Sequence, residues 1–200
     1  MNYIEMSEKN VKENAIKLFE IIKKDNYDYD LVIFISKGAF SIGNELANMK
    51  NVPLLEIHAQ RKGGVIKRLL KPFMRCVPKS ILIGLRRHEM KTPYHEKNKE
   101  RNVSYSEKKY SEHIKSKKIL LVDDSIDSGY SIMETLNKLK EIFKNSEIKT
   151  AVFNTMNKSK YKPEYTLFSD VMICGPWSND SKYYKEFICK YKEWKKNYDR

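Results

Sequence analysis

Apolar and polar residues along the chain follow two different periods. Residues 7–24 carry apolar side chains three and four positions apart, from Val11 to Ile22, which predicts a helix with Ser7 as its N-cap. The run Leu31–Ile35 is short, apolar and rich in β-branched residues, which predicts a buried strand. These two patterns alternate through most of the chain.

The remaining segments extend this alternation. Further strands are expected at residues 52–58, 80–85, 119–122, 148–154 and 171–174, and further helices at residues 41–49, 131–143 and 181–197. Strands that alternate with helices favour an α/β fold, with a mainly parallel sheet flanked by helices on both faces. Ligands bind such sheets at the carboxyl ends of the strands, here after Ile35, Leu85 and Val122.

Two segments depart from this pattern. Residues 86–116 have almost no apolar periodicity and many charges, which predicts a long polar loop of the kind that forms functional lids or stays disordered. Residues 61–79 mix apolar and basic side chains. The second segment could lie on an anionic membrane or a nucleic-acid backbone, but an ordinary helix packed on the sheet, or a dimer contact, is the favoured interpretation.

Composition narrows the class of protein. The 200 residues are 40% hydrophobic and 32% charged, which suits one domain with a sizeable core. Cys76, Cys174 and Cys189 are far apart in sequence, so a disulfide framework or a zinc site is not expected. The first residues are polar and no apolar run is long enough to cross a bilayer, so we expect a cytoplasmic protein. The net charge of +13 permits an anionic partner, but a lysine-rich coding bias explains it equally well.

Candidate chemistry gathers where the strand at 119–122 is expected to end. Two adjacent carboxylates, Asp123 and Asp124, are followed by a loop with Gly129 and then by a helix. Backbone amides at a helix N-terminus suit a phosphate, and glycine permits a tight turn and close backbone approach. The carboxylates suit sugar hydroxyls or Mg²⁺ instead. A ligand with a sugar diol, a 5′-phosphate and a metal-bound diphosphate meets these requirements; an ordinary turn whose acids cap the helix is the alternative.

The segment 119–131, I-L-L-V-D-D-S-I-D-S-G-Y-S, resembles the signature of type I phosphoribosyltransferases that binds 5-phosphoribosyl-1-diphosphate (PRPP). The resemblance implies that Asp123 and Asp124 face the ribose hydroxyls and a Mg²⁺ ion. It implies that the loop binds the 5′-phosphate through Asp127, Ser128, Gly129, Tyr130 and Ser131. It also implies the fold of that family, with a core at about 28–155 and a small hood from about 1–27 and 156–200.

The end of the first strand resembles the pyrophosphate loop of the same family. The residues that carry this resemblance are Ser36, Lys37 and Gly38. It implies that Lys37 is a charge partner of the diphosphate, with a catalytic role, and that Gly38 lets the backbone approach it. A plain strand-to-helix turn is the alternative.

Further site residues follow from position relative to the motif. The stretch from Arg86 to about Lys109 occupies the place of the mobile lid of the family, and Arg86, Arg87 and Lys91 could supply positive charge to the leaving diphosphate. Solvated loop residues without a catalytic role are the alternative. In purine-type members, the acid at the position of Asp127 lies near the incoming base, which makes Asp127 a candidate general base.

The C-terminal part of the chain would hold the acceptor. Pro163-Glu164-Tyr165 and Gly175-Pro176-Trp177 resemble the corresponding region of hypoxanthine, guanine and xanthine transferases, and the acceptor-binding candidates are Val171, Met172 and Trp177. For Trp177, a buried core position is the favoured alternative. The 6-oxopurine enzymes carry a lysine shortly before the last strand, whereas this chain has Ser169-Asp170-Val171-Met172.

The sequence therefore predicts a Mg²⁺-dependent phosphoribosyltransferase that moves the phosphoribosyl group of PRPP to a small-molecule acceptor of the nucleobase type. A homodimer is compatible with the resemblance. Two alternatives stay open at this point. One is phosphoribosyl transfer to a non-base acceptor, such as a glycan or a secondary metabolite. The other is a non-catalytic PRPP sensor that binds nucleic acid, since a fold alone does not fix a function.

Overall fold

A six-stranded sheet forms the centre of the computed structural model, which describes residues 2–61 and 101–199. The strand order is β4-β3-β2-β5-β6-β7, and every neighbouring pair is parallel except β3 and β4. The strands are β2 (Leu31–Ile35), β3 (Leu54–Arg61), β4 (Arg101–Tyr105), β5 (Lys118–Ile126), β6 (Glu147–Thr155) and β7 (Tyr165–Ser169). The chain leaves β2 toward β3 on one side and builds β5, β6 and β7 on the other, so the strand order reverses between β2 and β5.

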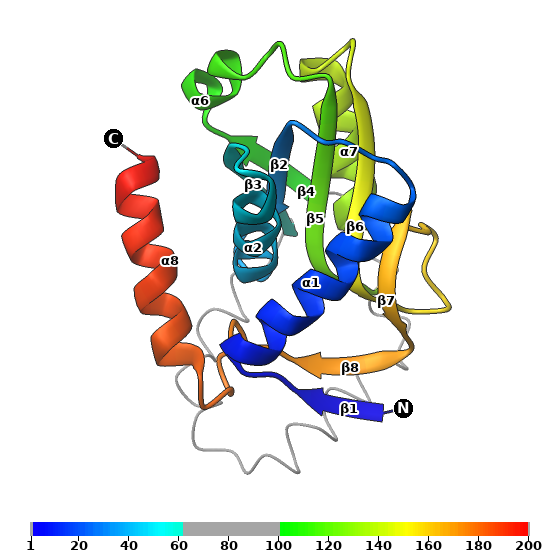
Figure 1. Cartoon of the computed structure of the whole chain (residues 1–200), viewed down its shortest axis with the longest axis vertical. Helices are drawn as coiled ribbons and strands as arrows, with labels where there is room; N and C mark the ends of the chain where they lie inside the picture. Colours follow the sequence, from blue (N-terminus) through cyan, green and yellow to red (C-terminus); the bar gives the residue numbers. More distant parts are fainter. Residues whose placement is uncertain (1, 62–100, 200) are drawn as a thin grey trace.

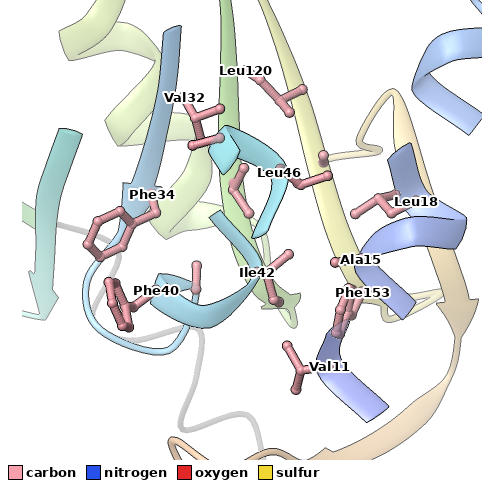
Figure 2. Close-up of a cluster of buried hydrophobic side chains, with 14 of the residues drawn as sticks. Val11, Ala15, Leu18, Val32, Phe34, Phe40, Ile42, Leu46, Leu120 and Phe153 are labelled. Atoms are coloured by element: carbon pink, nitrogen blue, oxygen red, sulfur yellow. The ribbon is translucent and has the colours of Figure 1, made fainter. Parts of the chain in front are cut away.

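Helices cover both faces of this sheet (Figure 1). The helices α1 (Glu8–Lys24), α2 (Phe40–Lys50) and α8 (Tyr184–Tyr198) pack on one face, while α6 (Glu107–Glu112) and α7 (Tyr130–Ile142) pack on the other. Successive strand residues point to opposite faces, so Val32 and Phe34 contact the first group and Leu31 and Ile33 the second. Figure 2 shows the first of these two cores, where side chains of α1 and α2 lie against the strands.

Two strands near the ends of the chain form a separate small sheet. The strands β1 (Asn2–Glu5) and β8 (Val171–Cys174) pair in parallel. The backbone amide of Val171 donates to Oδ1 of Asn154, near the carboxyl end of β6, at 3.2 Å. The small sheet is therefore attached at the edge of the main sheet where ligands bind in folds of this type.

Most predicted elements are present with shifts of a few residues at their ends. The strand at 31–35 and the helix capped by Ser7 match the prediction, and the expected α/β fold is confirmed. The capping box of that helix uses Asn10, whose backbone N–H donates to Oγ of Ser7 at 3.2 Å. The strand at 171–174 is present, but it belongs to the small sheet and not to the main one.

The prediction of an unbroken polar loop over 86–116 was wrong in its second half. Residues 101–105 form β4 and residues 107–112 form α6. An edge strand needs apolar residues on one face only, and here Val103 and Tyr105 supply them while Asn102 and Ser104 are exposed. The strand expected at 80–85, residues 62–79 of the basic segment, and the first part of the lid lie outside the described residues. Among the helices that the structure describes, none is long and apolar enough to span a bilayer.

Candidate active site

The carboxyl end of β5 places two acidic side chains on opposite faces of the sheet. Asp123 shares a face with Leu121 and is 8% exposed, while Asp124 shares the other face with Val122 and is half-buried. The backbone amide of Asp124 donates to Oδ1 of Asp123 at 2.9 Å. The sheet thus presents one carboxylate toward α7 and one toward the loop that follows β2.

The loop between β5 and α7 encloses a small cavity. The cavity measures about 70 Å³, and its polar lining comes from Arg101, Asp123, Ser125, Asp127, Ser128, Gly129 and Ser131. Gly129, at the N-cap of α7, has a φ of 88°, which glycine adopts without strain. No acidic residue lies in the first turn of α7. The loop therefore brings residues 128–131, the predicted phosphate-binding residues, to the N-terminus of a helix, where backbone amides and the helix dipole favour an anion.

The segment between β6 and β7 contacts the loop between β5 and α7. The amide of Lys160 donates to the carbonyl oxygen of Ser128 at 3.2 Å, and Nζ of Lys160 donates to the hydroxyl of Tyr130 at 2.8 Å. A Cβ atom at Gly129 would lie 2.9 Å from the backbone nitrogen of Tyr161. The loop between β5 and α7 is therefore held in place by Lys160 and Tyr161, and a side chain at position 129 would have no room.

The structure brings the predicted pyrophosphate loop and the acidic pair together. A Cβ atom added to Gly38 would lie only 2.9 Å from Oδ1 of Asp124. The peptide bond between Ser36 and Lys37 is cis. Since β2 and β5 are neighbours at the point where the strand order reverses, the two motifs lie side by side at the carboxyl edge of the sheet.

The C-terminal helix holds the side chains of the pyrophosphate loop. Nζ of Lys37 donates to the hydroxyl of Tyr184 at 3.0 Å, and the hydroxyls of Ser36 and Tyr191 are 3.4 Å apart. Tyr191 also donates to Glu56 on β3. Lys37 is thus positioned by a residue that lies 147 positions away in sequence.

Glu56 is a buried carboxylate at the centre of this contact. Burial alone would raise its pKa, but hydrogen bonds from His58, Lys195, Tyr191 and Ser36 outweigh it and lower the pKa from 4.5 to about 2. Nε2 of His58 lies 3.4 Å from Oε2 of Glu56, and Lys195 pairs with the same oxygen. Glu56 is therefore ionised at neutral pH and ties α8 to β3.

The pKa values of the acidic pair, Asp123 and Asp124, shift in the opposite direction from that of Glu56. Burial raises the pKa of Asp123, and the neighbouring Asp124 carboxylate raises it further; burial also raises the pKa of Asp124. Two buried adjacent carboxylates suit a divalent cation or sugar hydroxyls, which stabilise the ionised forms. In the part of the chain that the structure describes, no cluster of three metal-ligating side chains occurs. The donor set therefore fits a Mg²⁺ ion that takes its remaining ligands from a substrate and water.

The acceptor candidates lie in and after β8. Met172 and Trp177 are buried, and Val171 is half-buried. The side chain of Trp177 hydrogen-bonds to Asp124 and lowers the pKa of that carboxylate, against the larger effect of burial. The indole is thus in contact with Asp124 and packs in the core.

The remaining predicted site residues divide into two groups. Asp127 is exposed and lines the cavity, whereas Arg86, Arg87 and Lys91 lie outside the described residues. The sequence analysis missed Arg101, Glu56 and Tyr184. Arg101 carried a weak signal, because it begins a short alternation of polar and apolar residues; nothing local marks Glu56 or Tyr184, whose roles depend on contacts distant in sequence.

Comparison with known proteins shows which family and which folds this chain resembles. The family described as "Phosphoribosyl transferase domain" matches residues 4–183. A search among curated protein sequences gave no match. Three solved structures resemble this one over most of both chains.

The first is a purine phosphoribosyltransferase from Pyrococcus horikoshii, with 18% identity, a TM-score of 0.58, and coverage of 89% of this chain and 95% of that one. The second is a xanthine-guanine-hypoxanthine phosphoribosyltransferase from Helicobacter pylori, with 14% identity, a TM-score of 0.61, and coverage of 92% and 99%. The third is a hypothetical protein from Neisseria gonorrhoeae with bound ppGpp, with 19% identity, a TM-score of 0.59, and coverage of 94% of each chain. At these identities the likeness concerns the fold.

Proposed function

The chain belongs to the phosphoribosyl transferase domain family, which makes it a phosphoribosyltransferase by family, and we propose that it transfers the 5-phosphoribosyl group of PRPP to a nucleobase with release of diphosphate. The observation that carries this proposal is the contact between the two motifs. Gly38 abuts the Asp124 carboxylate, and the phosphate loop begins three residues after Asp124. The two motifs together would offer successive sites for a diphosphate, a ribose and a 5′-phosphate.

Each end of PRPP would have its own binding residues. The backbone amides of residues 128–131 and the dipole of α7 would hold the 5′-phosphate. Asp123 and Asp124 would accept hydrogen bonds from the ribose hydroxyls and hold Mg²⁺, which when bound offsets the negative charge of the diphosphate. Lys37 would contact the diphosphate as it leaves. Binding energy at the phosphate end thereby positions C1 for attack.

The reaction exchanges one bond at C1 for another. The bond between C1 and the diphosphate oxygen breaks, the electron pair leaves with the diphosphate, and a ring nitrogen of the acceptor forms the new bond to C1. The acceptor nitrogen loses a proton, and the carboxylate of Asp127, which is exposed and lines the cavity, would take it. The small sheet of β1 and β8 would form the hood over the acceptor.

Two structural relatives that are named as purine transferases support a purine acceptor. Residues 169–172 provide no lysine for the 6-oxo group, which separates this chain from the usual 6-oxopurine pattern. The acceptor class is therefore the part of the proposal that most needs a direct assay.

The test is diphosphate release from PRPP and Mg²⁺ with single bases: hypoxanthine, guanine, xanthine, adenine and uracil. We expect release with at least one base and a loss of turnover in Asp127→Asn with PRPP binding retained. PRPP binding without release for any base would contradict transfer to a nucleobase. Release with glycan or secondary-metabolite acceptors would then favour the non-base transferase, and salt-sensitive nucleic-acid affinity without turnover would favour the regulator.

A further inference from the structure

The cavity beside the loop between β5 and α7 is lined by Arg101, a positively charged residue that lies outside the sequence motif. Arg101 is the first residue of β4 and pairs with Arg61 in the antiparallel ladder at the sheet edge. It is 8% exposed, and its Nε donates to Oγ of Ser131 at 3.1 Å. Among the described residues that line the cavity, Arg101 is the only one with a positive charge.

Arg101 offsets part of the negative charge that lines the cavity. A guanidinium stays protonated at all relevant pH values, so Arg101 brings a permanent positive charge to the cavity. Asp123 and Asp127 line the same cavity and would repel a phosphate, which backbone amides alone offset only in part. Lys160, the nearby lysine of the segment between β6 and β7, directs its Nζ to the Tyr130 hydroxyl. Arg101 is therefore the described side chain best placed to compensate a phosphate dianion.

The hydrogen bond from Arg101 to Ser131 also orients both side chains in the cavity. The hydroxyl oxygen of Ser131 accepts from Nε of Arg101, so its own hydrogen can point to a ligand oxygen. The guanidinium is planar and presents its donors as a rigid fork that matches phosphate oxygens. The pair thus aligns two donors, one from β4 and one from α7, on the same small volume.

We propose that Arg101 binds the 5′-phosphate of the sugar substrate together with Ser131. This inference rests on the proposed function, because it names a further residue of the same site. It assigns a ligand-binding role to a residue of the sheet edge, outside the loop on which the family motif depends.

The test measures binding of two fragments of PRPP, ribose 5-phosphate and inorganic diphosphate, by calorimetry. Arg101→Gln should weaken ribose 5-phosphate binding by about tenfold or more, as expected for loss of charge-assisted hydrogen bonds. Diphosphate binding should stay within about twofold, because Lys37 and the loop of β2 are unchanged. Arg101→Lys keeps the charge but loses the fork and should be intermediate for ribose 5-phosphate.

Controls separate a binding role from a structural one. Lys138→Gln removes one positive charge from the exposed side of α7, where Lys138 pairs with Glu141, and should leave both affinities within about twofold. An equal loss of both fragments in Arg101→Gln would show a structural role and overturn the inference, as would unchanged ribose 5-phosphate affinity. If Arg101→Gln does not fold, Arg101→Lys decides, and unchanged affinity there overturns it. Wild-type protein that binds neither PRPP nor ribose 5-phosphate would instead contradict the proposed function itself.

Discussion

Asp124 is the residue on which the two halves of the site meet. Its carboxylate lies against Gly38 on one side and accepts a hydrogen bond from the Trp177 side chain on the other. Burial raises the pKa of this carboxylate, and the hydrogen bond from Trp177 lowers it. The orientation and the charge of Asp124 are therefore controlled by residues from two distant segments, which makes position 38 sensitive to the smallest added group.

Gly38→Ala tests this arrangement. The new Cβ atom would lie 2.9 Å from Oδ1 of Asp124, and the carboxylate, being the end of a side chain, would turn away while the backbone stays. We expect PRPP affinity in the presence of Mg²⁺ to fall by about tenfold, since a misplacement of 1 Å can cost about a hundredfold in an aligned site and the shift expected here is smaller. Calorimetry of the folded variant measures it.

A double-mutant cycle supplies the control. In an Asp124→Ala background the added methyl group meets no carboxylate, so Gly38→Ala should have no further effect on PRPP affinity. Additive losses in the double variant would contradict the contact as the cause.

Helix α8 positions the predicted pyrophosphate loop, residues 36–38, through its side chains. Its aromatic face packs on the core, with the Trp194 ring centroid 5.2 Å from that of Phe34, and Tyr191 lies 5.3 Å from Phe40 by the same measure. The same face carries Tyr184 to Lys37. The helix is thus fixed by its apolar contacts and by Glu56, and from that position it orients the pyrophosphate loop.

Tyr184→Phe removes the hydroxyl that accepts from Lys37 and leaves the ring. A single hydrogen bond contributes about 1 kcal/mol, so we expect diphosphate to bind about fivefold more weakly and the free energy of unfolding to fall by no more than about 1 kcal/mol. Tyr183→Phe removes a hydroxyl at the preceding position, the N-cap of α8, and serves as the matched control. Tighter diphosphate binding in Tyr184→Phe would mean that the tyrosine competes with the ligand for Lys37.

Glu56→Gln tests how α8 is attached. Because the pKa of Glu56 is lowered from 4.5 to about 2 in the folded protein, its ionised form stabilises the fold above about pH 4.5, and this contribution is lost as the pH falls toward 2. Linkage predicts a loss on the order of 3 kcal/mol in the free energy of unfolding at pH 7.

Urea denaturation at a series of pH values measures this difference. The gap between wild type and Glu56→Gln should narrow between pH 4.5 and 2, whereas Glu134→Gln, an exposed change on α7, should match wild type at every pH. A gap that stays constant with pH would argue against the ionised carboxylate as the source of the stability.

Sequence alone predicts the elements whose pattern is local. The strand at 31–35 is apolar throughout because it is buried on both faces, and the loop after β5 carries its chemistry in consecutive residues. By contrast, β4 is an edge strand with one apolar face, and Arg101 gains its place only because β4 pairs with β3 beside α7. Glu56 and Tyr184 likewise depend on where α8 packs. Contacts of this kind arise from tertiary structure and leave little trace in local periodicity.

At the scale of the whole molecule, the site lies where the sheet changes direction. The chain proceeds from β2 to β3 on one side and from β5 to β7 on the other. The loops after β2 and β5 therefore meet where the strand order reverses, which is where ligands bind in folds of this type. The small sheet of β1 and β8 is attached at the same edge through Asn154. All the predicted binding residues that the structure describes thus surround one end of the main sheet.

The measurement that tests this account most directly is calorimetric titration of the protein with PRPP, with and without Mg²⁺. It should be repeated on an Asp123→Asn/Asp124→Asn double variant. The account predicts binding that requires Mg²⁺ and is lost in the folded double variant, because the two carboxylates hold the ribose and the metal-bound ligand. Failure of the folded wild-type protein to bind PRPP, with or without a nucleobase present, would contradict it.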